Sequence, residues 1–329
     1  MDIITQKGYI AHMLFIDNPR LDPYLNLAME EHLLTSFDED IFMLWRNDRS
    51  VIIGKNQNTR SEVNVEYANK NGIAVVRRLT GGGAVFHDPG NLNFSFMVKD
   101  SEGFFSDFRR FTAPIIDTLR FYGLNAEHDG RNDITVNGRK VSGNAQAVCK
   151  GRFLHHGTLL FTVDFSALES VLNVDEDKIR SKGIRSVRKR VTNISEFTDV
   201  SIEEFKSEIK FGDRYELTEA DYAAAAGLKE EKYGTWEWNY GYSPKYSFHN
   251  KICAAGGIVE TFIDAKGGVI SGIKFYGDFF ARRDIAEIET ALTGSRHERD
   301  SAKSVLEGYD IDEYFHNVTV NELLDCLGV

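Results

Sequence analysis

The sequence contains little cysteine and no long apolar segment. Its three cysteines, Cys149, Cys253 and Cys326, are far apart and lack CxxC spacing, so neither a disulfide framework nor a cysteine-based zinc site is expected. No run of about 18 apolar residues occurs, which predicts that the chain has no transmembrane helix. Residues 1–12 lack the apolar core of a secretory signal. These absences together indicate a protein of the reducing cytoplasm.

Positive charge is also scarce. The 329 residues include 39 Lys and Arg against 50 Asp and Glu, a formal net charge of −11. This balance disfavours non-specific binding to nucleic acids and to membrane surfaces, because both are polyanionic. Hydrophobic residues make up 42% of the chain and aromatic residues 12%, so the chain can bury a large core. At about 150 residues per domain, the length predicts about two domains.

Two helices are predicted in the first part of the chain. Asp22 is a good N-cap and Pro23 fits the first helical position, so a helix is expected from there to residue 34. Apolar residues recur at helical spacing over residues 108–122, and Gly123 is a natural end. Pro114 lies inside that second stretch, so the second helix is expected to start late or to kink.

Short apolar runs between these helical stretches predict strands. In one run, apolar residues alternate with Asn93, Ser95 and Met97, which places these three on one face of a strand. The predicted strands are Phe42–Trp45, Val51–Ile53, Ile73–Val76, Leu92–Val98 and Thr158–Val163.

The end of the chain is predicted to form a second, smaller domain. The aromatic stretch Trp236–Tyr246 is typical of a connector, with a hinge expected near residues 241–244. Beyond it, Gly267 and Gly268 separate two strand-like runs, Ile258–Ile263 and Val269–Phe275, as in a hairpin. Two helices are expected to begin at capping boxes, formed by Asp284 with Glu287 and by Thr319 with Glu322. The predicted domains are residues 1–243 and a small α+β domain of residues 246–329.

A glycine-rich segment follows one of the predicted strands. Residues Arg77–Val85 contain two arginines, a threonine and three consecutive glycines. Glycines allow backbone N–H groups to line an anion, and the adjacent arginines would add positive charge. The segment is neither a GxGxxG nor a GxxxxGK[ST] motif. The alternative is a flexible surface turn.

A second candidate site is a predicted hairpin. Asn137-Gly138 is a strong signal for a two-residue turn. Such a turn would place Val136, Thr135, Ile134 and Asp133 opposite Arg139, Lys140, Val141 and Ser142, respectively. One face would then carry Asp133, Thr135, Lys140 and Ser142, and the other would be apolar. The polar face could hold a magnesium–nucleotide and a substrate carboxylate. The alternative is a solvated face with a weak ion pair.

Three further features carry weaker signals. Lys178–Arg190 has seven basic and no acidic residues, which suggests a polyphosphate ligand or else a solvated surface loop. His155 and His156 are adjacent in a strand and point to opposite faces, so they are not expected to share a metal. His87 and Asp88 are interpreted as a loop turn rather than a catalytic pair.

Several of these segments together resemble the lipoate–protein ligases, and the match is closest to the single-chain ligases of Gram-positive bacteria. The resemblance covers nearly the whole chain, apart from an apparent N-terminal extension of about a dozen residues. The segments that carry it are Arg77–Asp88, Gly90–Phe96, Arg131–Ile134, Gly138–Gln146, His155–Leu160, Ser181–Arg188, Arg190–Asn193 and Trp236–Gly241.

The resemblance implies an enzyme with two steps. Such ligases use ATP to convert free lipoate to lipoyl-AMP, with release of pyrophosphate and with magnesium as cofactor. They then transfer the lipoyl group to a lysine on lipoyl domains of 2-oxoacid dehydrogenases or on the glycine-cleavage H protein. The implied fold is α+β or α/β: a large domain with a mixed β-sheet flanked by helices, similar to biotin ligases and class II synthetase cores, plus the small C-terminal domain. Neither nucleic acid nor membrane is an expected partner.

The resemblance also implies site residues. Lys140 matches the essential lysine that contacts the activated carboxyl group and the α-phosphate. The residues implied at the ATP or adenylate are Arg78, Gly81, Gly82, Gly83, Ala84, Val85, Phe86, Lys140, Lys182 and Arg188. Those implied at the lipoyl group are Leu27, Glu30, Trp45, Arg78, Lys140 and His156. Asn132 and Asp133 are implied near the phosphates and magnesium.

Two other functions stay open from the sequence. One is an ATP-independent transferase that moves lipoyl or octanoyl groups between proteins, usually through a cysteine, for which Cys149 is the candidate. The other is a nucleotide- or RNA-binding module, which the acidic balance disfavours. The ligase hypothesis makes a geometric prediction: Lys140 and the glycines Gly81–Gly83 must face one shared cavity.

Overall fold

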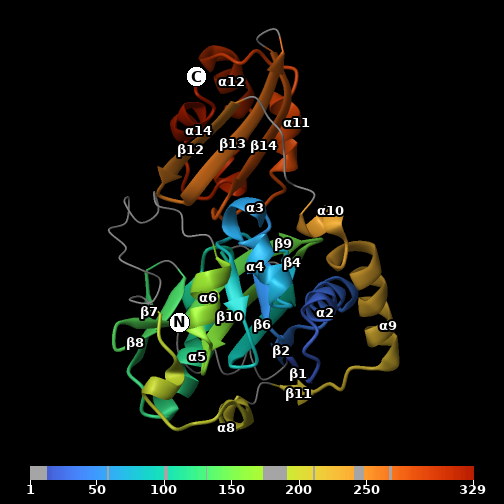
Figure 1. Cartoon of the computed structure of the whole chain (residues 1–329), viewed down its shortest axis with the longest axis vertical. Coiled ribbons are helices and arrows are strands. Elements are labelled where there is room, and N and C mark those ends of the chain that lie inside the picture. Colours follow the sequence, from blue (N-terminus) through green and yellow to red (C-terminus); the bar gives the residue numbers. More distant parts are fainter. Residues whose placement is uncertain are drawn as a thin grey trace.

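The computed structural model describes residues 13–57, 59–99, 103–130, 132–172, 191–209, 212–240, 248–266 and 269–329. A large domain formed by the first two thirds of the chain carries a smaller C-terminal domain at one end (Figure 1). The expected domain boundary and hinge, residues 241–246, lie outside the described residues. Within the described ranges, no helix combines the length and apolarity needed to cross a membrane.

The large domain is built on an eight-stranded mixed sheet. Strand β1 runs parallel to both of its neighbours, and every other pair in this sheet is antiparallel. In spatial order the strands are β11 (Asp213–Arg214), β1 (Leu14–Asn18), β2 (Ile41–Trp45), β6 (Asn91–Lys99), β10 (Arg152–Leu160), β9 (Arg139–Cys149), β8 (Asp133–Val136) and β7 (Ala126–Asp129). Strand β10 begins and ends earlier than the predicted run Thr158–Val163.

A second, three-stranded sheet carries the glycine-rich segment. Strand β3 (Ser50–Ile53) pairs in parallel with β4 (Ala74–Arg77) and antiparallel with β5 (Val85–His87). Residues 78–84 therefore connect an edge strand to the opposite edge of the same small sheet. This connection fixes both ends of the loop, because each end continues a hydrogen-bonded strand.

Helices flank the eight-stranded sheet on both faces, as expected. The helical elements are α2 (Pro23–Ser36), α3 (Thr59–Glu62), α4 (Val65–Lys70), α5 (Phe108–Phe121), α6 (Phe165–Val171), α8 (Ile202–Glu208), α9 (Glu219–Leu228) and α10 (Trp236–Asn239), with a 3₁₀ turn η2 (Ile194–Glu196) and a π-helical turn η3 (Lys229–Tyr233). The Asp22 carboxylate accepts hydrogen bonds from two N–H groups of the first turn of α2, which confirms the predicted cap. Helix α5 starts at Phe108 and includes Pro114, so the late start, one of the two expected alternatives, is wrong, and the kink stays a prediction.

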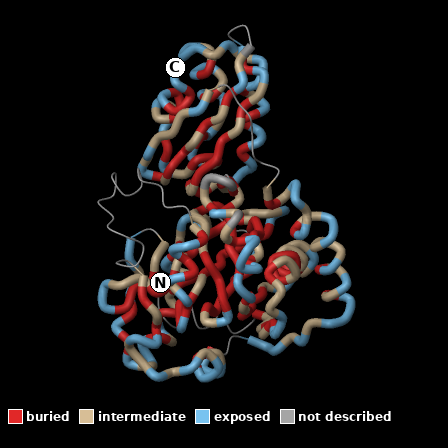
Figure 2. The backbone as a smooth tube through the Cα atoms, viewed as in Figure 1, coloured by how far each residue is buried: buried red, intermediate tan, exposed pale blue. Residues whose placement is uncertain are grey.

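The alternation of the strands separates two cores. On β10, Phe153 packs in the cluster that contains helix α5, whereas its neighbour Leu154 packs in the cluster that contains helix α2. Successive strand residues point to opposite faces, so the two helices cover opposite sides of the sheet. Figure 2 shows buried residues concentrated along these strands and exposed residues on the outer helices. The apolar core predicted from the composition is therefore divided into two layers around the sheet.

The C-terminal domain is a three-stranded antiparallel sheet packed against helices. Its strands are β12 (Phe248–Ala254), β13 (Gly257–Lys266) and β14 (Val269–Gly277), and its helices are α11 (Ala286–Leu292), α12 (Arg299–Leu306), α13 (Ile311–Tyr314) and α14 (Val320–Cys326). Strands β13 and β14 pair as predicted, although the turn at residues 267–268 lies outside the described residues.

One of the two predicted capping boxes is present. Thr319 and Glu322 form a complete box at the start of α14. The box predicted at Asp284 and Glu287 is wrong, because the N-cap of α11 is Ile285. The Glu287 carboxylate instead accepts a hydrogen bond from Tyr314 Oη at 2.7 Å. The Asp284 carboxylate still accepts from the Ala286 N–H at 3.0 Å, so the tertiary contact replaces only the Glu287 half of the box.

The two domains touch close to the glycine-rich segment. The Gly277 N–H donates to the Asn56 carbonyl at 2.6 Å, and the Phe280 ring packs against the Phe108 ring at a centroid distance of 5.4 Å. Helix α10, which lies in the predicted connector, is part of the large domain: the Asn239 side chain accepts from the Arg77 N–H at 2.8 Å. The connector stretch is therefore anchored to strand β4 at its beginning.

Candidate active site

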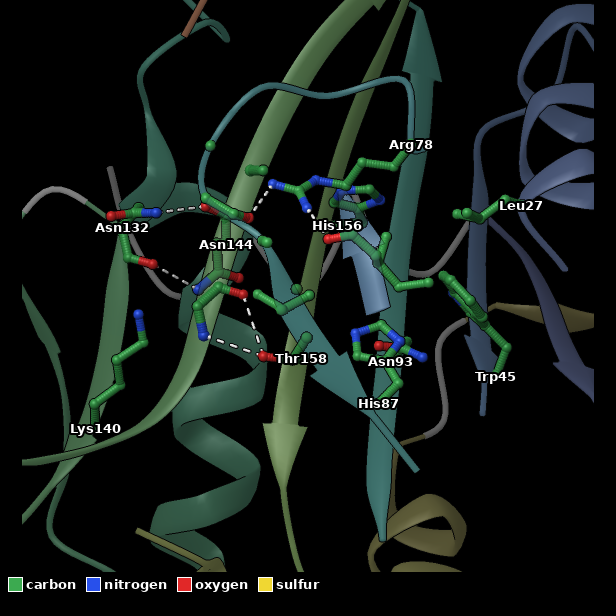
Figure 3. Close-up of a pocket in the computed structure, with 18 residues that line it drawn as sticks. Leu27, Trp45, Arg78, His87, Asn93, Asn132, Lys140, Asn144, His156 and Thr158 are labelled. Atoms are coloured by element: carbon green, nitrogen blue, oxygen red, sulfur yellow. Dashed lines mark hydrogen bonds between the residues drawn. The ribbon is translucent and has the colours of Figure 1, made fainter. Parts of the chain in front are cut away.

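A cavity of about 190 Å³ lies in the large domain. Its walls come from helix α2, from both sheets and from the loop between β4 and β5 (Figure 3). The lining residues are Leu27, Trp45, Ile52, Arg78, Gly82, Gly83, Ala84, Val85, His87, Asn93, Asn132, Lys140, Gly143, Asn144, Ala145, His156, Gly157 and Thr158. Ten of these were predicted from the sequence, and they come together here from distant parts of the chain.

The geometric prediction is met for the loop residues Gly82 and Gly83. Both line the same cavity as Lys140. In Figure 3, Lys140 and Asn132 lie at one end of the cavity, and Leu27 and Trp45 lie at the other. The cavity therefore joins a cationic end to a mainly apolar end.

Lys140 is positioned by the predicted two-residue turn. Asn137 and Gly138 both have positive φ, 51° and 73°, as a type I′ turn requires. Thr135 lies opposite Lys140, as predicted, but beyond that point an irregularity at Val141 shifts the register.

The shift corrects part of the predicted hairpin. Ser142 lies opposite Ile134, and Asp133 lies opposite Gly143, so the predicted pair of Asp133 with Ser142 is wrong. The extra residue of a bulge is not specified by the turn sequence. The Asp133 carboxylate nevertheless reaches the Lys140 ammonium, with 2.7 Å between Oδ1 and Nζ. The ion pair anticipated on this face is therefore present.

Arg78 shapes the glycine loop from inside. Its guanidinium donates to the carbonyls of Gly81 at 2.6 Å, Gly83 at 2.9 Å and Ile52 at 3.0 Å. Burial lowers the pKa of this guanidinium to about 10, and the nearby Glu30 carboxylate opposes that shift. Arg78 therefore remains a cation at neutral pH, and its donors hold the loop in shape beside the cavity.

Three predictions about this segment need correction. Gly81 does not line the cavity: a Cβ on it would lie 2.4 Å from the Phe279 carbonyl oxygen, so it faces the small domain. Phe86 packs in a hydrophobic core, because its neighbours on strand β5 take the cavity face. Arg77, expected to add charge to an anion site, is fully buried and donates to backbone carbonyls, including that of Gly54 at 2.9 Å.

Glu30 and His156 form part of a continuous hydrogen-bonded chain. Arg78 Nε donates to Thr80 Oγ1 at 2.9 Å, and that hydroxyl lies 2.8 Å from His156 Nε2. A carboxylate can only accept, so the His156 proton on Nδ1 points to Glu30. Nδ1 lies 2.9 Å from Glu30 Oε1, which also accepts from Ser95 Oγ at 2.6 Å.

This chain explains where the predicted Glu30 acts. Glu30 is 1% exposed and does not line the cavity, whereas His156 does. The carboxylate therefore fixes the tautomer and orientation of His156 from behind. Ser95, which donates to the same carboxylate, also holds Trp45: the Trp45 Nε1 donates to Ser95 Oγ at 2.9 Å.

His155 points to the opposite face from His156, as predicted, and it positions the cationic end of the cavity. Its Nδ1 lies 3.1 Å from Gln146 Nε2, and its Nε2 lies 3.2 Å from Asn144 Oδ1. Burial lowers its pKa well below the ordinary value, so the ring is neutral. Asn144 in turn exchanges hydrogen bonds with Asn132 at 2.6 and 2.9 Å.

Eight lining residues were not among the predicted site residues: Ile52, His87, Asn93, Gly143, Asn144, Ala145, Gly157 and Thr158. Two of them, His87 and Asn93, lie beside Trp45. His87 was interpreted as part of a turn, and Asn93 was placed on a strand face without a function. His87 ends strand β5 and shares its face with Val85, and Asn93 lies on β6 directly opposite Trp45. Period-two alternation of Val85, Phe86 and His87 was the signal that could have identified the histidine.

The remaining candidates lie away from the cavity or outside the described residues. Lys182 and Arg188, with all of residues 173–190, lie outside the described residues, as does Arg131. Cys149 is partly buried and does not line the cavity. Burial raises the pKa of its thiol, with a contribution from Glu31, so the thiolate is disfavoured.

The donors for a metal ion are few. Among the described residues, no group of three or more His, Cys, Asp or Glu side chains could hold one. Asn132 and Asp133 offer one amide oxygen and one carboxylate near Lys140. Mg²⁺ at nucleotide sites takes one or two carboxylates together with phosphate oxygens. The pair therefore suits a magnesium ion that arrives with a nucleotide rather than one held by protein alone.

Comparison with known families identifies the chain. The lipoyl protein ligase A/B catalytic domain family matches residues 22–211, and the bacterial lipoate protein ligase C-terminus matches residues 243–327. A lipoate–protein ligase of Bacillus subtilis (strain 168) is 46% identical over 330 residues, which cover 96% of this chain and 100% of that protein. The chain belongs to the lipoate–protein ligase family.

Solved structures of similar proteins extend this result to the fold. P. falciparum LipL1 in complex with lipoate matches this ligase with a TM-score of 0.78 and 25% identity, over 95% of this chain and 98% of that chain. An archaeal bipartite ligase of Thermoplasma acidophilum, described with its E2 lipoyl domain, has a TM-score of 0.63 and 35% identity, over 72% of this chain and 100% of that chain. A lipoate–protein ligase A bound with ATP has a TM-score of 0.60 and 35% identity, over 70% of this chain and 98% of that chain. The fold predicted from the sequence, a mixed sheet flanked by helices with a small additional domain, is therefore confirmed.

Proposed function

We propose that this ligase converts free lipoate and ATP to lipoyl-AMP and pyrophosphate, and then transfers the lipoyl group to a lysine of a lipoyl domain. One observation carries the proposal. Lys140 and the backbone of Gly82 and Gly83 line one cavity, whose other end is walled by Leu27 and Trp45. A cation beside a glycine loop suits phosphates, and an apolar end suits an alkyl chain.

In the first step, a carboxylate oxygen of lipoate bonds to the α-phosphorus of ATP, and the bond to pyrophosphate breaks. The attack brings two anions together and builds negative charge on the phosphoryl oxygens. The Lys140 ammonium and the Arg78 guanidinium offset this repulsion as fixed cations. All the hydrogen bonds described above for Arg78 go to protein groups, so its contribution is its charge and the loop shape it maintains. The likeness to a ligase bound with ATP supports this step.

Magnesium would be held by Asp133 and Asn132 together with the phosphates. When bound, the ion would supply positive charge that offsets the charge of the phosphates. The Asp133 carboxylate pairs with Lys140, so its charge keeps the ammonium near the phosphate end. The amide of Asn132 is held by its exchange of hydrogen bonds with Asn144.

The lipoyl chain occupies the end of the cavity near helix α2. Leu27 and Trp45 line this end, and each buried methylene contributes about 0.8 kcal/mol to binding. His156 borders the same space and is held by Glu30. The likeness to LipL1 in complex with lipoate supports lipoate as the substrate.

In the second step, a neutral lysine amine of the acceptor attacks the carbonyl carbon of the mixed anhydride. An amide bond forms, AMP leaves, and the amine proton passes to solvent. Lys140 stabilises the negative charge that develops on the carbonyl oxygen. The acceptors are lipoyl domains of 2-oxoacid dehydrogenases and the glycine-cleavage H protein. The archaeal ligase described with its E2 lipoyl domain supports this class of acceptor.

The ATP-independent transferase is the second candidate, and the position of its nucleophile disfavours it. Such an enzyme needs a reactive cysteine beside the acyl chain. Cys149 does not line the cavity, and burial raises its pKa. A reactive cysteine instead has a lowered pKa and access to the substrate.

One experiment tests the proposal against this alternative. The protein is incubated with lipoate, ATP, Mg²⁺ and an apo lipoyl domain, and mass spectrometry detects lipoylation of the domain; pyrophosphate–ATP exchange is measured in parallel without the acceptor. We expect modification that requires ATP, and exchange that requires lipoate. Modification from an octanoylated donor protein without ATP, together with no exchange, would establish the transferase instead.

A further inference from the structure

The end of the cavity away from Lys140 contains two buried N–H donors without a partner. His87 is 3% exposed and Asn93 is 2% exposed, and both line the cavity. Neither His87 Nε2 nor Asn93 Nδ2 has a hydrogen-bond partner among the described residues. Figure 3 shows the two side chains together beside Trp45. Buried donors in proteins almost always have a hydrogen-bond partner. Two such donors without a partner, both facing a cavity, therefore point to a ligand that carries an acceptor.

The proton position on His87 is fixed by the residues behind it. Asn26 Nδ2 donates to Asn47 Oδ1 at 2.9 Å, which turns the Asn47 amide nitrogen toward the histidine. That nitrogen lies 3.1 Å from His87 Nδ1. Since Nδ1 accepts, the proton of the neutral ring lies on Nε2. Burial, reinforced by Arg78 and His156, lowers the pKa of His87 to about 3, so the ring stays neutral at physiological pH.

The amide of Asn93 is oriented in a similar way. Asn91 Nδ2 donates to Asn93 Oδ1 at 2.8 Å, so the Asn93 nitrogen is the atom left for the cavity. Strand β6 places Asn93 between Trp45 on β2 and Thr158 on β10. Both donors are thus presented by rigid strands and held by hydrogen bonds from neighbouring side chains.

The position of these donors limits what they can bind. Lys140, at the other end, would contact the carboxyl group of a fatty-acid substrate, so the far end receives the distal part of the chain. The neighbouring Leu27 and the face of Trp45 are apolar. An occupant must therefore be mainly apolar and still carry an acceptor at its distal end. The dithiolane ring of lipoate meets both conditions, because its two sulfur atoms are weak acceptors.

We propose that His87 and Asn93 form a subsite for the dithiolane sulfurs and thereby favour lipoate over a straight fatty acid of equal length. The inference rests on the proposed function, since it assigns the distal end of the same substrate. An octanoyl chain has no acceptor there, so it leaves both donors unpaired. A site built to bond a substrate group disfavours an analogue that lacks this group.

The first test uses the unmodified protein and isolates the sulfur atoms from the shape of the ring. Pyrophosphate–ATP exchange is measured with lipoate and with 5-cyclopentylpentanoate, in which methylene groups replace both sulfurs. We expect kcat/KM to be about fivefold or more higher for lipoate, as one modest hydrogen bond gives. Equal kcat/KM values for the two acids would overturn the inference. A water molecule that bonds both donors in place of the sulfurs would give this result.

The second test removes the donors. His87→Phe and Asn93→Leu each remove the donor nitrogen that faces the cavity and replace it with apolar atoms. The ratio of kcat/KM for lipoate to that for the cyclopentyl acid should fall toward one in each variant, and further in the double variant. Leu27→Ala is the matched control: it removes apolar contacts with both acids, so their ratio should stay unchanged.

The ratio is insensitive to damage to the fold, because both acids are compared in one preparation. An unchanged ratio in His87→Phe and Asn93→Leu would refute the subsite while leaving the ligase function intact. Failure of the proposed function is a different result, namely no exchange with lipoate in the unmodified protein. The two outcomes are therefore distinguishable.

Discussion

Replacing Lys140 with methionine should separate catalysis from folding. The change keeps most of the side-chain volume and removes the charge that faces the phosphate end of the cavity. Lys140 is 30% exposed and its partner Asp133 is 19% exposed. Ion pairs with this degree of solvent access contribute about 0–1 kcal/mol to stability. The free energy of unfolding should therefore change little, with a shift in Tm of at most about 2–4 °C.

The effect on the reaction should be much larger. A unit charge about 4 Å from a developing negative charge contributes about 4 kcal/mol at an effective dielectric constant of 20. Loss of one preorganised donor to a developing oxyanion typically lowers kcat by about 10²–10³-fold. We therefore expect Lys140→Met to lower lipoate-dependent pyrophosphate–ATP exchange by about two to three orders of magnitude.

The neighbouring Arg139 offers a matched control. It lies on the same strand, forms an exposed ion pair with Glu196 at 2.7 Å, and does not line the cavity. Arg139→Met changes the net charge by the same amount and should retain exchange within about threefold, because an exposed pair has little energetic effect. Exchange in Lys140→Met within threefold of the unmodified protein, with the fold verified by circular dichroism, would refute the role given to Lys140. An equal loss in Arg139→Met would attribute the effect to general charge.

Three other predictions address the rest of the site. Cys149→Ser should retain ligation measured by mass spectrometry, because the thiol lies outside the cavity and burial raises its pKa. Gly81→Ala should destabilise the protein by about 1–3 kcal/mol in urea unfolding, as overpacking does, because the new Cβ would lie 2.4 Å from the Phe279 carbonyl oxygen. Stability should also fall below pH 6.5, because burial lowers the pKa of His87 to about 3 and that of His155 well below its ordinary value. The unfolded chain then binds more protons than the folded one. The free energy of unfolding therefore falls by up to about 1.4 kcal/mol per pH unit for each histidine.

Each of these has its own control. A folded but inactive Cys149→Ser protein would revive an acyl-enzyme route. Gly83→Ala is the comparison for Gly81→Ala, because no atom lies within 4 Å of the new Cβ; equal destabilisation of both would contradict the close-approach argument. In His155→Gln, the free energy of unfolding from pH 7.5 to 5.5 should fall less steeply than in the unmodified protein, since one of the histidines with a lowered pKa is gone. An unchanged slope would remove His155 from the explanation.

Local sequence determined the elements that present the site. Asp22 and Pro23 specified the start of α2, which carries Leu27 and Glu30, because their side chains satisfy or avoid the free N–H groups of a first turn. Asn137 and Gly138 specified the turn before Lys140, because both tolerate positive φ. These signals act within a few residues, so they can be read without the fold. The resemblance to the ligase family then named the residues that meet in the cavity.

Tertiary structure decided which atoms of those residues face the ligand. Arg77 and Arg78 are adjacent and chemically alike, yet one anchors helix α10 and the other shapes the glycine loop, because successive strand residues point in opposite directions. The register shift at Val141 has no local signal, since its cause is pairing with β8. The unpaired donors of His87 and Asn93 depend on contacts from distant segments. A chain specifies turns and caps through neighbouring atoms, but burial and hydrogen-bond partners are properties of packing, and only the folded molecule assigns them.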